Sequence, residues 1–386
     1  MTALTPLERS ALLLVAVLTA LAGVANYQPW PAVPRFAVAT LALAGLAWVV
    51  SFATEQLGER FGPGVTGMLQ STLGNLPELF VVIFALKKGE LVVAQTAIVG
   101  SILANALLVL GLVIVVGARR SQDGIMRFSK RLPRDTATLL QVTVFIIVLL
   151  GLSLASHDPA SHHVQAISAV GAVCLLIVYL AWVVPYLRSD VAPGDERVQA
   201  DSGIGVQAEA NPARLARAGE QRGHPADDEA RPVPRLGLGL TLTLLIVAGT
   251  ASVFVSDWFI NGLEPAISIL HISQAFAGLV IVAIAGNAAE NTAGLVLAYK
   301  GRSDLAISVV KNSVAQIAAF LFPLLVLVSL LLATTLTFAL APVYIGALAL
   351  TALALWQVTG DGEAAEFEGW ALVALYVILA TLTLYE

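Results

Sequence analysis

Apolar residues run along the chain in long blocks, separated by short polar or Pro/Gly-rich breaks. A helix needs roughly 20 such residues to cross a ~30 Å hydrocarbon layer, and about eleven blocks approach that length. They lie near residues 10–27, 35–54, 64–86, 91–117, 137–156, 165–187, 237–257, 273–299, 304–333, 337–357 and 369–385. Because the apolar residues are continuous and do not alternate with polar ones, the pattern predicts helices and not barrel strands. We therefore expect an all-α polytopic membrane protein.

The composition agrees with a protein whose main surroundings are the lipid bilayer. Of the 386 residues 58% are hydrophobic and only 12% are charged, and the mean hydropathy is +0.85. A soluble domain is closer to half apolar and a quarter charged. The single Cys174 excludes an internal disulfide framework, and a net charge of −5 gives no reason to expect nucleic acid as a partner. The first block resembles a signal-peptide core, but Glu8 beside Arg9 leaves its positive region poor, so we interpret it as a membrane helix.

One long polar segment, residues 188–235, interrupts the blocks after the sixth of them. It holds nine Asp or Glu and seven Arg, with few large apolar residues, so we expect a flexible linker. With the N-terminus inside, seventeen Lys or Arg fall on the cytoplasmic side, which then includes the linker, and three on the other. This bias predicts an N-inside, C-outside topology. Short loops and the lack of an organelle signal favour the cytoplasmic membrane of a prokaryote.

The chain also contains an internal repeat. "GNLPELF" at 74–80 and "GNAAENT" at 286–292 share Gly-Asn-x-x-Glu, and the same shift of 212 places Lys88-Gly89 on Lys300-Gly301 and Ser101 on Ser313. Each half has five spans, an odd number, so the two halves enter the membrane in opposite orientations. This inverted arrangement is typical of secondary transporters, which bind their ions near mid-membrane between the repeats. We predict an N-terminal helix (1–33), a first five-helix repeat (34–187), a cytoplasmic linker (188–235) and a second five-helix repeat (236–386).

Glu78 and Glu290 are the only carboxylates that lie far from the ends of the predicted spans. A charge at the bilayer centre costs at least about 2.5–3.5 kcal/mol, so such residues face a cavity, pair with another group, or carry a proton. A neutral, hydrogen-bonded glutamate without any ligand is the alternative in each half. Two glutamates at repeat-related positions instead indicate a shared function.

The residues around these glutamates offer further oxygen atoms. On one helix Ser71, Asn75 and Glu78 would share a face, and Pro77 would leave the carbonyl of Leu73 free and kink the helix. A hard cation such as Ca²⁺ takes six to eight oxygen ligands and favours carboxylates. The two glutamates would be its metal ligands, and the remaining oxygens would come from Asn75, Asn287, Ser101, Ser313 and freed carbonyls. The spans contain no cluster of Cys or His, which argues against a zinc or copper site.

The same carboxylates indicate how transport would be coupled. Gly74 and Gly286 allow close backbone approach and local unwinding at the motif. A carboxyl group in a low-dielectric cavity holds a proton more tightly than one in water, and a cation that needs the ionised form must displace that proton. Cation and protons would then bind in turn, as exchange requires, while the repeats rock against each other.

The two motif regions resemble those of the calcium/proton exchanger branch of the cation/calcium antiporter superfamily. The resemblance covers "GNLPELFVVIFALKKGELVVAQTAIVGSILANALLVLG" (74–111) and "GNAAENTAGLVLAYKGRSDLAISVVKNSVAQIAAFLFP" (286–323), about a fifth of the chain. It implies that Glu78 and Glu290 are the central ligands of the cation and of protons. It also implies that the site or its pathway is lined by Asn75, Asn287, Ser101, Ser313, Asn105 and Gln316.

Three residues depart from the family pattern. Asn291 stands where members often have a His after the second Glu, and Asn312 replaces a Gly. Lys311 has Val99 as its repeat partner. We expect Lys311 to extend along the helix toward the cytoplasmic surface, and the alternative is an ammonium inside the cavity that modulates ion choice.

We interpret the chain as a secondary transporter and not as an enzyme. The expected activity is Ca²⁺/H⁺ antiport, with transported Ca²⁺ and H⁺ in place of any cofactor, and a Na⁺/H⁺ or K⁺/H⁺ exchanger on the same scaffold is the nearest alternative. A channel is disfavoured because the acidic pair lies in inverted halves of one chain and not in symmetric subunits. An intramembrane enzyme is disfavoured because neither H-E-x-x-H nor G-x-S-x-G occurs.

Overall fold

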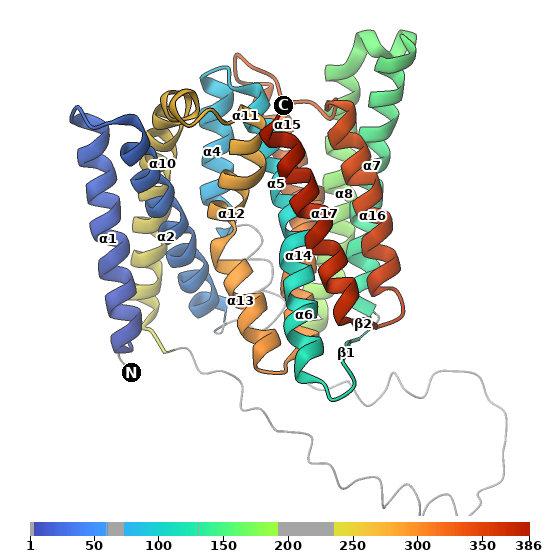
Figure 1. Cartoon of the computed structure of the whole chain (residues 1–386), viewed down its shortest axis with the longest axis horizontal. Coiled ribbons are helices and arrows are strands. Elements are labelled where there is room, and N and C mark those ends of the chain that lie inside the picture. The colour runs from blue at the N-terminus through green and yellow to red at the C-terminus, as the bar shows by residue number, and fades with distance from the viewer. Residues whose placement is uncertain (1–3, 59, 61–72, 130, 192–234) are drawn as a thin grey trace, which may run out of the picture.

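The computed structural model describes residues 4–58, 60, 73–129, 131–191 and 235–386. In these ranges the chain is almost wholly helical (Figure 1). The elements before residue 192 are α1 (Pro6–Tyr27), α2 (Ala32–Gly58), α4 (Leu76–Lys87), α5 (Leu91–Leu103), η1 (Ala104–Val109), α6 (Leu110–Arg120), β1 (Ile125–Arg127), α7 (Arg131–Ser156), η2 (Pro159–His163) and α8 (Val164–Val191). Those after residue 234 are α10 (Leu238–Leu270), α11 (Gln274–Phe276), η3 (Ala277–Val282), α12 (Ala283–Gly286), α13 (Ala288–Tyr299), α14 (Ser303–Gln316), η4 (Ile317–Leu321), α15 (Phe322–Ser329), α16 (Pro342–Thr359), β2 (Glu363–Ala365) and α17 (Glu366–Leu384).

The predicted all-α membrane fold is confirmed. In the described ranges nine helices are long and apolar enough to cross a membrane, and a tenth span results if the bent pair 274–286 and 288–299 is counted as one. The third predicted span, 64–86, is described only from residue 73 onward, where it contains α4. The expected number of eleven spans is therefore consistent with the structure.

The molecule has two ends that correspond to the two sides of a membrane. The N-terminal end of α1, the start of α10 and both short strands lie at the lower end in Figure 1, and the C-terminus lies at the upper end. We call the lower end the linker face, because α10 starts there directly after the 188–235 segment, and the upper end the opposite face. The turn that joins α4 to α5 lies on the opposite face, and the turn that joins α13 to α14 lies on the linker face (Figure 1).

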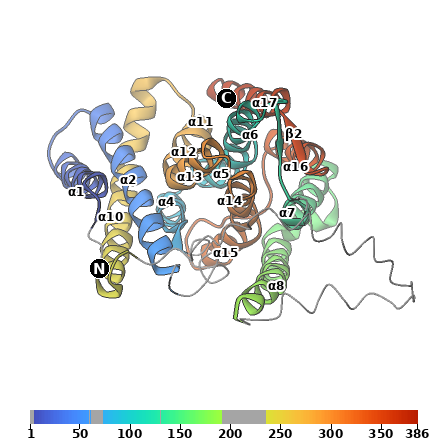
Figure 2. The ribbon, with the colours of Figure 1, turned by 90° about the horizontal axis from the view of Figure 1, so that it is seen from below.

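The helices form a central group with a smaller group on each side (Figure 2). Helices α1, α2 and α10 lie on one side, where α2 packs along α10, and α7, α8 and α16 lie on the other. Between them stand α4, α5, α6 and the segment from α11 to α15. Helix α10 of the second half packs on α4 of the first, and α2 of the first packs on α13 of the second. Helices of the two halves thus pack among one another, and the halves do not form two separate bundles.

Repeat-related positions have the same local structure. The helices break at 74–75 and at 286–287, and Asn75 (φ −89°, ψ 10°) and Asn287 (φ −103°, ψ 15°) adopt nearly the same backbone conformation. The second break bends the span by 61°. The π-helical segments η1 and η4 also coincide, because a shift of 212 places 104–109 on 316–321. From the breaks, α4 runs to the opposite face and α13 to the linker face, as an inverted pair must (Figure 1).

Two features differ from the sequence-based expectations. The seventh span does not end at 257, because α10 continues through Asp257, Glu264 and Pro265 to Leu270. Asp257 and Glu264 do not interrupt the helix, because charged side chains toward the end of a span can reach the membrane surface. On the linker face β1 and β2 pair antiparallel, with Met126 opposite Ala364, in a two-stranded ribbon that the apolar pattern does not indicate.

Candidate functional site

The two broken helices meet at the centre of the molecule. A Cβ atom added to Gly286 would lie 3.6 Å from the Cβ of Glu78, so the second break packs directly against the first motif. Glu78 and Glu290 each lie in the first turn of a helix that starts at its break. Because the N-terminal end of a helix carries a partial positive charge, this position offsets part of the cost of burying an ionised carboxylate.

Each glutamate has a serine of the neighbouring helix beside it. The Ser313 hydroxyl on α14 donates a hydrogen bond to Oε2 of Glu290. Ser101, its repeat partner on α5, lies within electrostatic range of Glu78, and so does Glu290. The glutamates and serines of both repeats therefore form one cluster, as the sequence predicts.

Asn287 connects the two repeats within this cluster. Its amide donates to the Ser101 hydroxyl at 3.0 Å and to the Ala283 carbonyl at 2.9 Å. An asparagine that precedes a helix normally caps it with its side-chain oxygen, but the Asn287 side chain makes no such bond to α13. The Asn105 amide donates to the Ser101 carbonyl at 3.0 Å from the π-helical segment η1. Both asparagines thus donate hydrogen bonds through their side-chain N–H groups to neighbouring protein atoms. Their side-chain oxygens remain free to accept a hydrogen bond or to bind a cation.

Several oxygens of the cluster are buried without a hydrogen-bond donor. Within the described residues the carboxylate oxygens of Glu78 and the Oδ1 atoms of Asn105 and Asn287 accept no hydrogen bond of normal geometry, although the Ser101 hydroxyl lies near Glu78. Glu78 is only 1% exposed, so bulk water does not reach its carboxylate to donate hydrogen bonds. Unpaired buried oxygens are costly unless a cation or proton satisfies them. Carboxylate and amide oxygens gathered in this way are the ligands that a hard cation prefers.

The cluster offers fewer charged groups than a resident metal centre. Among the described residues no group of three or more His, Cys, Asp or Glu is arranged to hold a metal ion. Two carboxylates with neutral oxygens around them suit an ion that binds and leaves again. Asn75 and Gln316, two further predicted residues, are also buried, at 3% and 7% exposure.

The first motif does not form the continuous helical face that its spacing suggests. Ser71 lies outside the described residues, and Asn75 precedes α4 at the break that includes Gly74. The expected alignment of Asn75 with Glu78 on one helix is therefore wrong. Pro77 is the second residue of α4, where its missing amide hydrogen costs nothing. The expected break at this motif is confirmed, but it lies before the proline.

Lys311 does not reach the surface, so the expectation that it extends to the cytoplasmic side is wrong. Its side chain is buried, at 1% exposure, and its ammonium group donates to the Thr359 hydroxyl near the end of α16. That hydroxyl in turn donates to the Leu355 carbonyl at 2.6 Å. The charge is satisfied by polar groups inside the protein, which is cheaper than exposing it to lipid.

Two buried serines of α10 are absent from the predicted site. Ser256 donates to the Pro77 carbonyl at 3.4 Å, directly before Glu78, and Ser252 is buried one turn earlier. Their signal in the sequence is a pair of small polar residues four apart in an otherwise apolar span. Without a motif beside them, that signal is too weak to assign them to the site.

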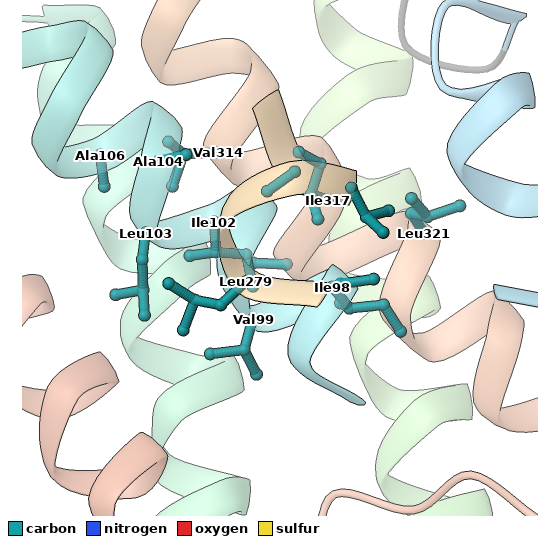
Figure 3. Close-up of a cluster of buried hydrophobic side chains, with 14 of the residues drawn as sticks. Ile98, Val99, Ile102, Leu103, Ala104, Ala106, Leu279, Val314, Ile317 and Leu321 are labelled. Atoms are coloured by element: carbon teal, nitrogen blue, oxygen red, sulfur yellow. The ribbon is translucent and has the colours of Figure 1, made fainter. Parts of the chain in front are cut away.

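Apolar side chains pack around α5, the helix that carries Ser101. Figure 3 shows Leu279 of η3 lying against Val99 and Ile102 of α5, with Val314 and Ile317 of the α14–η4 segment close by. All five side chains are buried in the main hydrophobic core.

The chain is similar in sequence to a family of known proteins. The model of the sodium/calcium exchanger protein family matches residues 32–186 and 240–385. A vacuolar calcium ion transporter of Schizosaccharomyces pombe is 31% identical over 369 residues, which cover 94% of this chain and 82% of the relative. A Ca²⁺/H⁺ antiporter of Synechocystis is 30% identical over 369 residues, 95% of each chain.

A solved structure agrees on the fold. The structure of native YfkE superposes with a TM-score of 0.75 at 24% identity, over 97% of this chain and all (100%) of the other. At that identity the likeness establishes the arrangement of helices and not the chemistry. The family match extends over both halves of the chain, and the relatives match over nearly its full length. The chain belongs to the sodium/calcium exchanger family, in its calcium/proton exchanger branch.

Proposed function

We propose that the protein exchanges Ca²⁺ for protons across a membrane, with Glu78 and Glu290 as ligands that both ions share. The observation that carries this proposal is that the second break packs against Glu78, with Glu290 within electrostatic range of it. The relatives named as calcium transporters and Ca²⁺/H⁺ antiporters support the choice of ions.

The cluster can hold either ion but not both. With both glutamates ionised, their oxygens and the unpaired Oδ1 atoms of Asn105 and Asn287 are ligands for Ca²⁺. Without the cation, the ionised Glu290 and the buried, ionised Glu78 repel each other, and proton uptake relieves the repulsion. Ser313 donates to Glu290 in the ionised form and so favours the cation-loaded state.

Transport requires that the site open to each side in turn. Helices α2 and α10 each pack on the broken helix of the other repeat, so a movement of this pair changes the surroundings of both glutamates together. We further propose that the linker face is cytoplasmic, that the N-terminus is inside, and that the membrane is the cytoplasmic membrane of a prokaryote. The bias of Lys and Arg toward the linker face supports this orientation.

Exchange of Na⁺ or K⁺ for protons is the second candidate. Asn291 follows Glu290, and its Oδ1 is buried without a donor within the described residues. A neutral oxygen there adds a ligand but no charge, which suits a monovalent ion better than a titratable side chain would. The assignment of two carboxylates to one site favours Ca²⁺, because two negative charges match a divalent ion.

Flux measurements in everted membrane vesicles test the proposal. A respiration-driven pH gradient should dissipate on addition of Ca²⁺, and Glu78→Gln and Glu290→Gln should each reduce this response. The expected reduction is roughly 30-fold or more, because removing one partner of a buried charged contact costs about 2–5 kcal/mol. Glutamine keeps the size and polarity of the side chain, so both variants should remain in the membrane in normal amounts.

The cation panel separates the candidates. Dissipation by Na⁺ or K⁺ but not by Ca²⁺ would replace the first proposal with the second. Normal Ca²⁺-dependent exchange in either glutamine variant would remove the shared-ligand mechanism altogether. Asp361→Asn is a matched control, because it also neutralises an acidic residue but lies exposed on the linker face.

A further inference from the structure

Three polar side chains join the α4–α5 turn to α10 on the opposite face. Lys88 directly follows α4, and its ammonium group donates a hydrogen bond to Oδ1 of Asn261 and lies 3.6 Å from Oδ1 of Asp257. The side-chain amide of Asn261 donates to Oδ2 of Asp257 at 3.1 Å. These two residues, one turn apart on α10, thus act together as the acceptor for the lysine. We call Lys88, Asp257 and Asn261 the lysine network.

A proline in α10 connects α2 to the same place. Pro265 has no amide hydrogen, so the carbonyl of Asn261, four residues earlier, loses its donor within the helix. Arg35, in the first turn of α2, donates to that carbonyl from its guanidinium group at 3.3 Å. A Cβ atom at Gly262 would lie 3.4 Å from the Cα of Phe36, so α2 and α10 are also in close contact there. The lysine network therefore holds α4 against the α2–α10 pair.

Helix α10 contacts α4 at both of its ends. At the inner end Ser256 donates to the carbonyl of Pro77, the residue before Glu78. At the outer end the lysine network joins the two helices. Separation of α4 from α10 on the opposite face therefore requires the lysine network to break.

The linker face has the same turn but not the same acceptors. Lys300 and Gly301 repeat Lys88 and Gly89, and both glycines have a positive φ, of 77° and 81°. The shift of 212 also aligns α2 with α10, because it matches the residues at which the two helices end. On α2 the positions of the two acceptors carry Gly45 in place of Asp257 and Val49 in place of Asn261. Neither has a polar side chain, so Lys300 cannot form the equivalent network with α2.

We propose that the lysine network is a latch, which holds α4 against the α2–α10 pair in this conformation and breaks whenever the ion cluster opens to the opposite face. The latch rests on the proposed exchange, which requires the cluster to open to each side in turn. Because the latch is intact, the present conformation is the one closed on the opposite face. The side chains of Lys88 and Asp257 are 32% and 38% exposed. Ion pairs as exposed as this are weak, as a contact that breaks in every transport cycle must be.

Reversible cross-linking tests the latch. Cys174 is the only cysteine of the chain, so Lys88→Cys and Asn261→Cys are introduced together in a Cys174→Ala background. A short bifunctional methanethiosulfonate reagent joins the two thiols, and a reducing agent releases them. A protease site inserted within 192–234 reports the cross-link, because the two cysteines then lie in different fragments that stay joined on a denaturing gel. We expect cross-linking to lower cation/proton exchange roughly tenfold or more, with recovery after reduction, because alternating access needs the two helices to separate.

Arg119→Cys with Glu366→Cys is the matched control pair. These residues also form a partly exposed ion pair between the two halves, with 2.7 Å between Nε and Oε1. They join α6 to α17 on the linker face, and opening on the opposite face does not require these helices to separate. Cross-linking the control pair should therefore leave exchange nearly unchanged.

The outcomes separate the latch from the choice of ion. Failure of the Lys88→Cys and Asn261→Cys pair to cross-link, or full exchange by the cross-linked protein, overturns the latch even if Ca²⁺/H⁺ exchange is normal. An equal loss of exchange in the control pair also overturns it. Loss of Na⁺/H⁺ or K⁺/H⁺ exchange on cross-linking, in a protein that does not exchange Ca²⁺ beforehand, retains the latch and overturns the calcium assignment.

Removal of the lysine charge should shift the balance between the two open states. Lys88→Met weakens the latch, so a larger fraction of the protein opens to the opposite face. The apparent KM for a cation offered from that face should then fall, and the KM from the linker face should rise. We expect a change of about two- to fivefold, the range for an exposed ion pair. Lys300→Met removes the same charge at the repeat-related turn and should change neither KM. Equal changes in the two variants, or a KM that shifts in the same direction from both faces, contradict the latch.

Discussion

Asparagine is the residue that distinguishes this site from a resident metal centre. Asn105 and Asn287, which both bond to Ser101, each present a buried Oδ1 without a donor in the described part of the chain. An amide oxygen offers a strong dipole but no charge, so it contributes to coordination without increasing the repulsion between the two glutamates. In the proposed exchange, such a site would attract an ion and still release it, which a ring of carboxylates would hinder.

Lys311 joins two helices and does not take part in the cluster of glutamates. Its ammonium group bonds to Thr359 on α16, whereas Ser313, two residues further along α14, faces Glu290. Residues two apart on a helix point in nearly opposite directions. The positive charge is thus directed away from the ion cluster, and it serves the attachment of α14 to α16.

Substitutions at this pair should differ in their cost. Thr359→Val leaves the ammonium without one of its acceptors, and we expect it to lower stability by about 1.5–3 kcal/mol, the range for hydrogen bonds to charged groups. Lys311→Met removes the charge together with its need for acceptors and should be tolerated better. Thermal unfolding midpoints of the purified variants measure the difference, and equal losses would contradict the explanation. Ion selectivity of Lys311→Met should match that of the parent, because the charge does not face Glu290.

At the scale of elements, a close backbone contact joins α5 of the first half to η3 of the second. Gly100 and Gly278 bring α5 and η3 together, and Leu279 then covers the face of α5. In a membrane such contacts carry much of the stability, because lipid tails compete equally for apolar side chains. Small residues at a helix contact therefore matter more here than they would in a soluble core.

Gly100→Ala tests that contact. The added methyl group would lie 2.4 Å from the Leu279 carbonyl, so α5 and η3 must separate. Overpacking of this kind costs typically about 1–3 kcal/mol, and we expect a lower unfolding midpoint and slower exchange. Gly346→Ala in α16 is the matched control, because no atom lies within 4 Å of its added Cβ. That control should be neutral or slightly stabilising, since alanine favours helix. Equal effects of both variants would exclude the proposed contact.

The sequence predicts the elements better than it predicts their ends. Apolar blocks identify the spans because lipid demands them, and a repeat of Gly-Asn-x-x-Glu identifies the two breaks. The same pattern ends the seventh span at 257, since it cannot distinguish a helix that leaves the membrane from one that stops. The pairing of Ser101 with Asn287 also escapes prediction, because it joins residues of different repeats. Such contacts depend on tertiary packing that no local pattern encodes.

At the scale of the whole molecule, the two halves form one folded unit. The hydrophobic core contains residues of both, and α2 with α10, α5 with η3 and α6 with α17 all pack across the division between them. On the linker face the ribbon of β1 and β2 adds a further connection, with an ion pair of 3.5 Å between Arg127 and Glu363. In the same turn the hydrogen bond from Arg127 holds the pKa of Asp123 below its ordinary value.

This interlocking predicts that the covalent connection between the halves is dispensable once the protein has folded. A protease site inserted within 192–234 should be cut without separating the fragments, because the contacts between α2 and α10 and between α6 and α17 persist. We expect the two fragments to elute together in size-exclusion chromatography and to retain cation/proton exchange after reconstitution. The uncut protein with the same insertion is the control for the inserted residues. Separation of the fragments in mild detergent would show that the linker, and not the packing of the repeats, holds the site together. Fragments that stay together but lose exchange would instead assign the linker a part in transport itself.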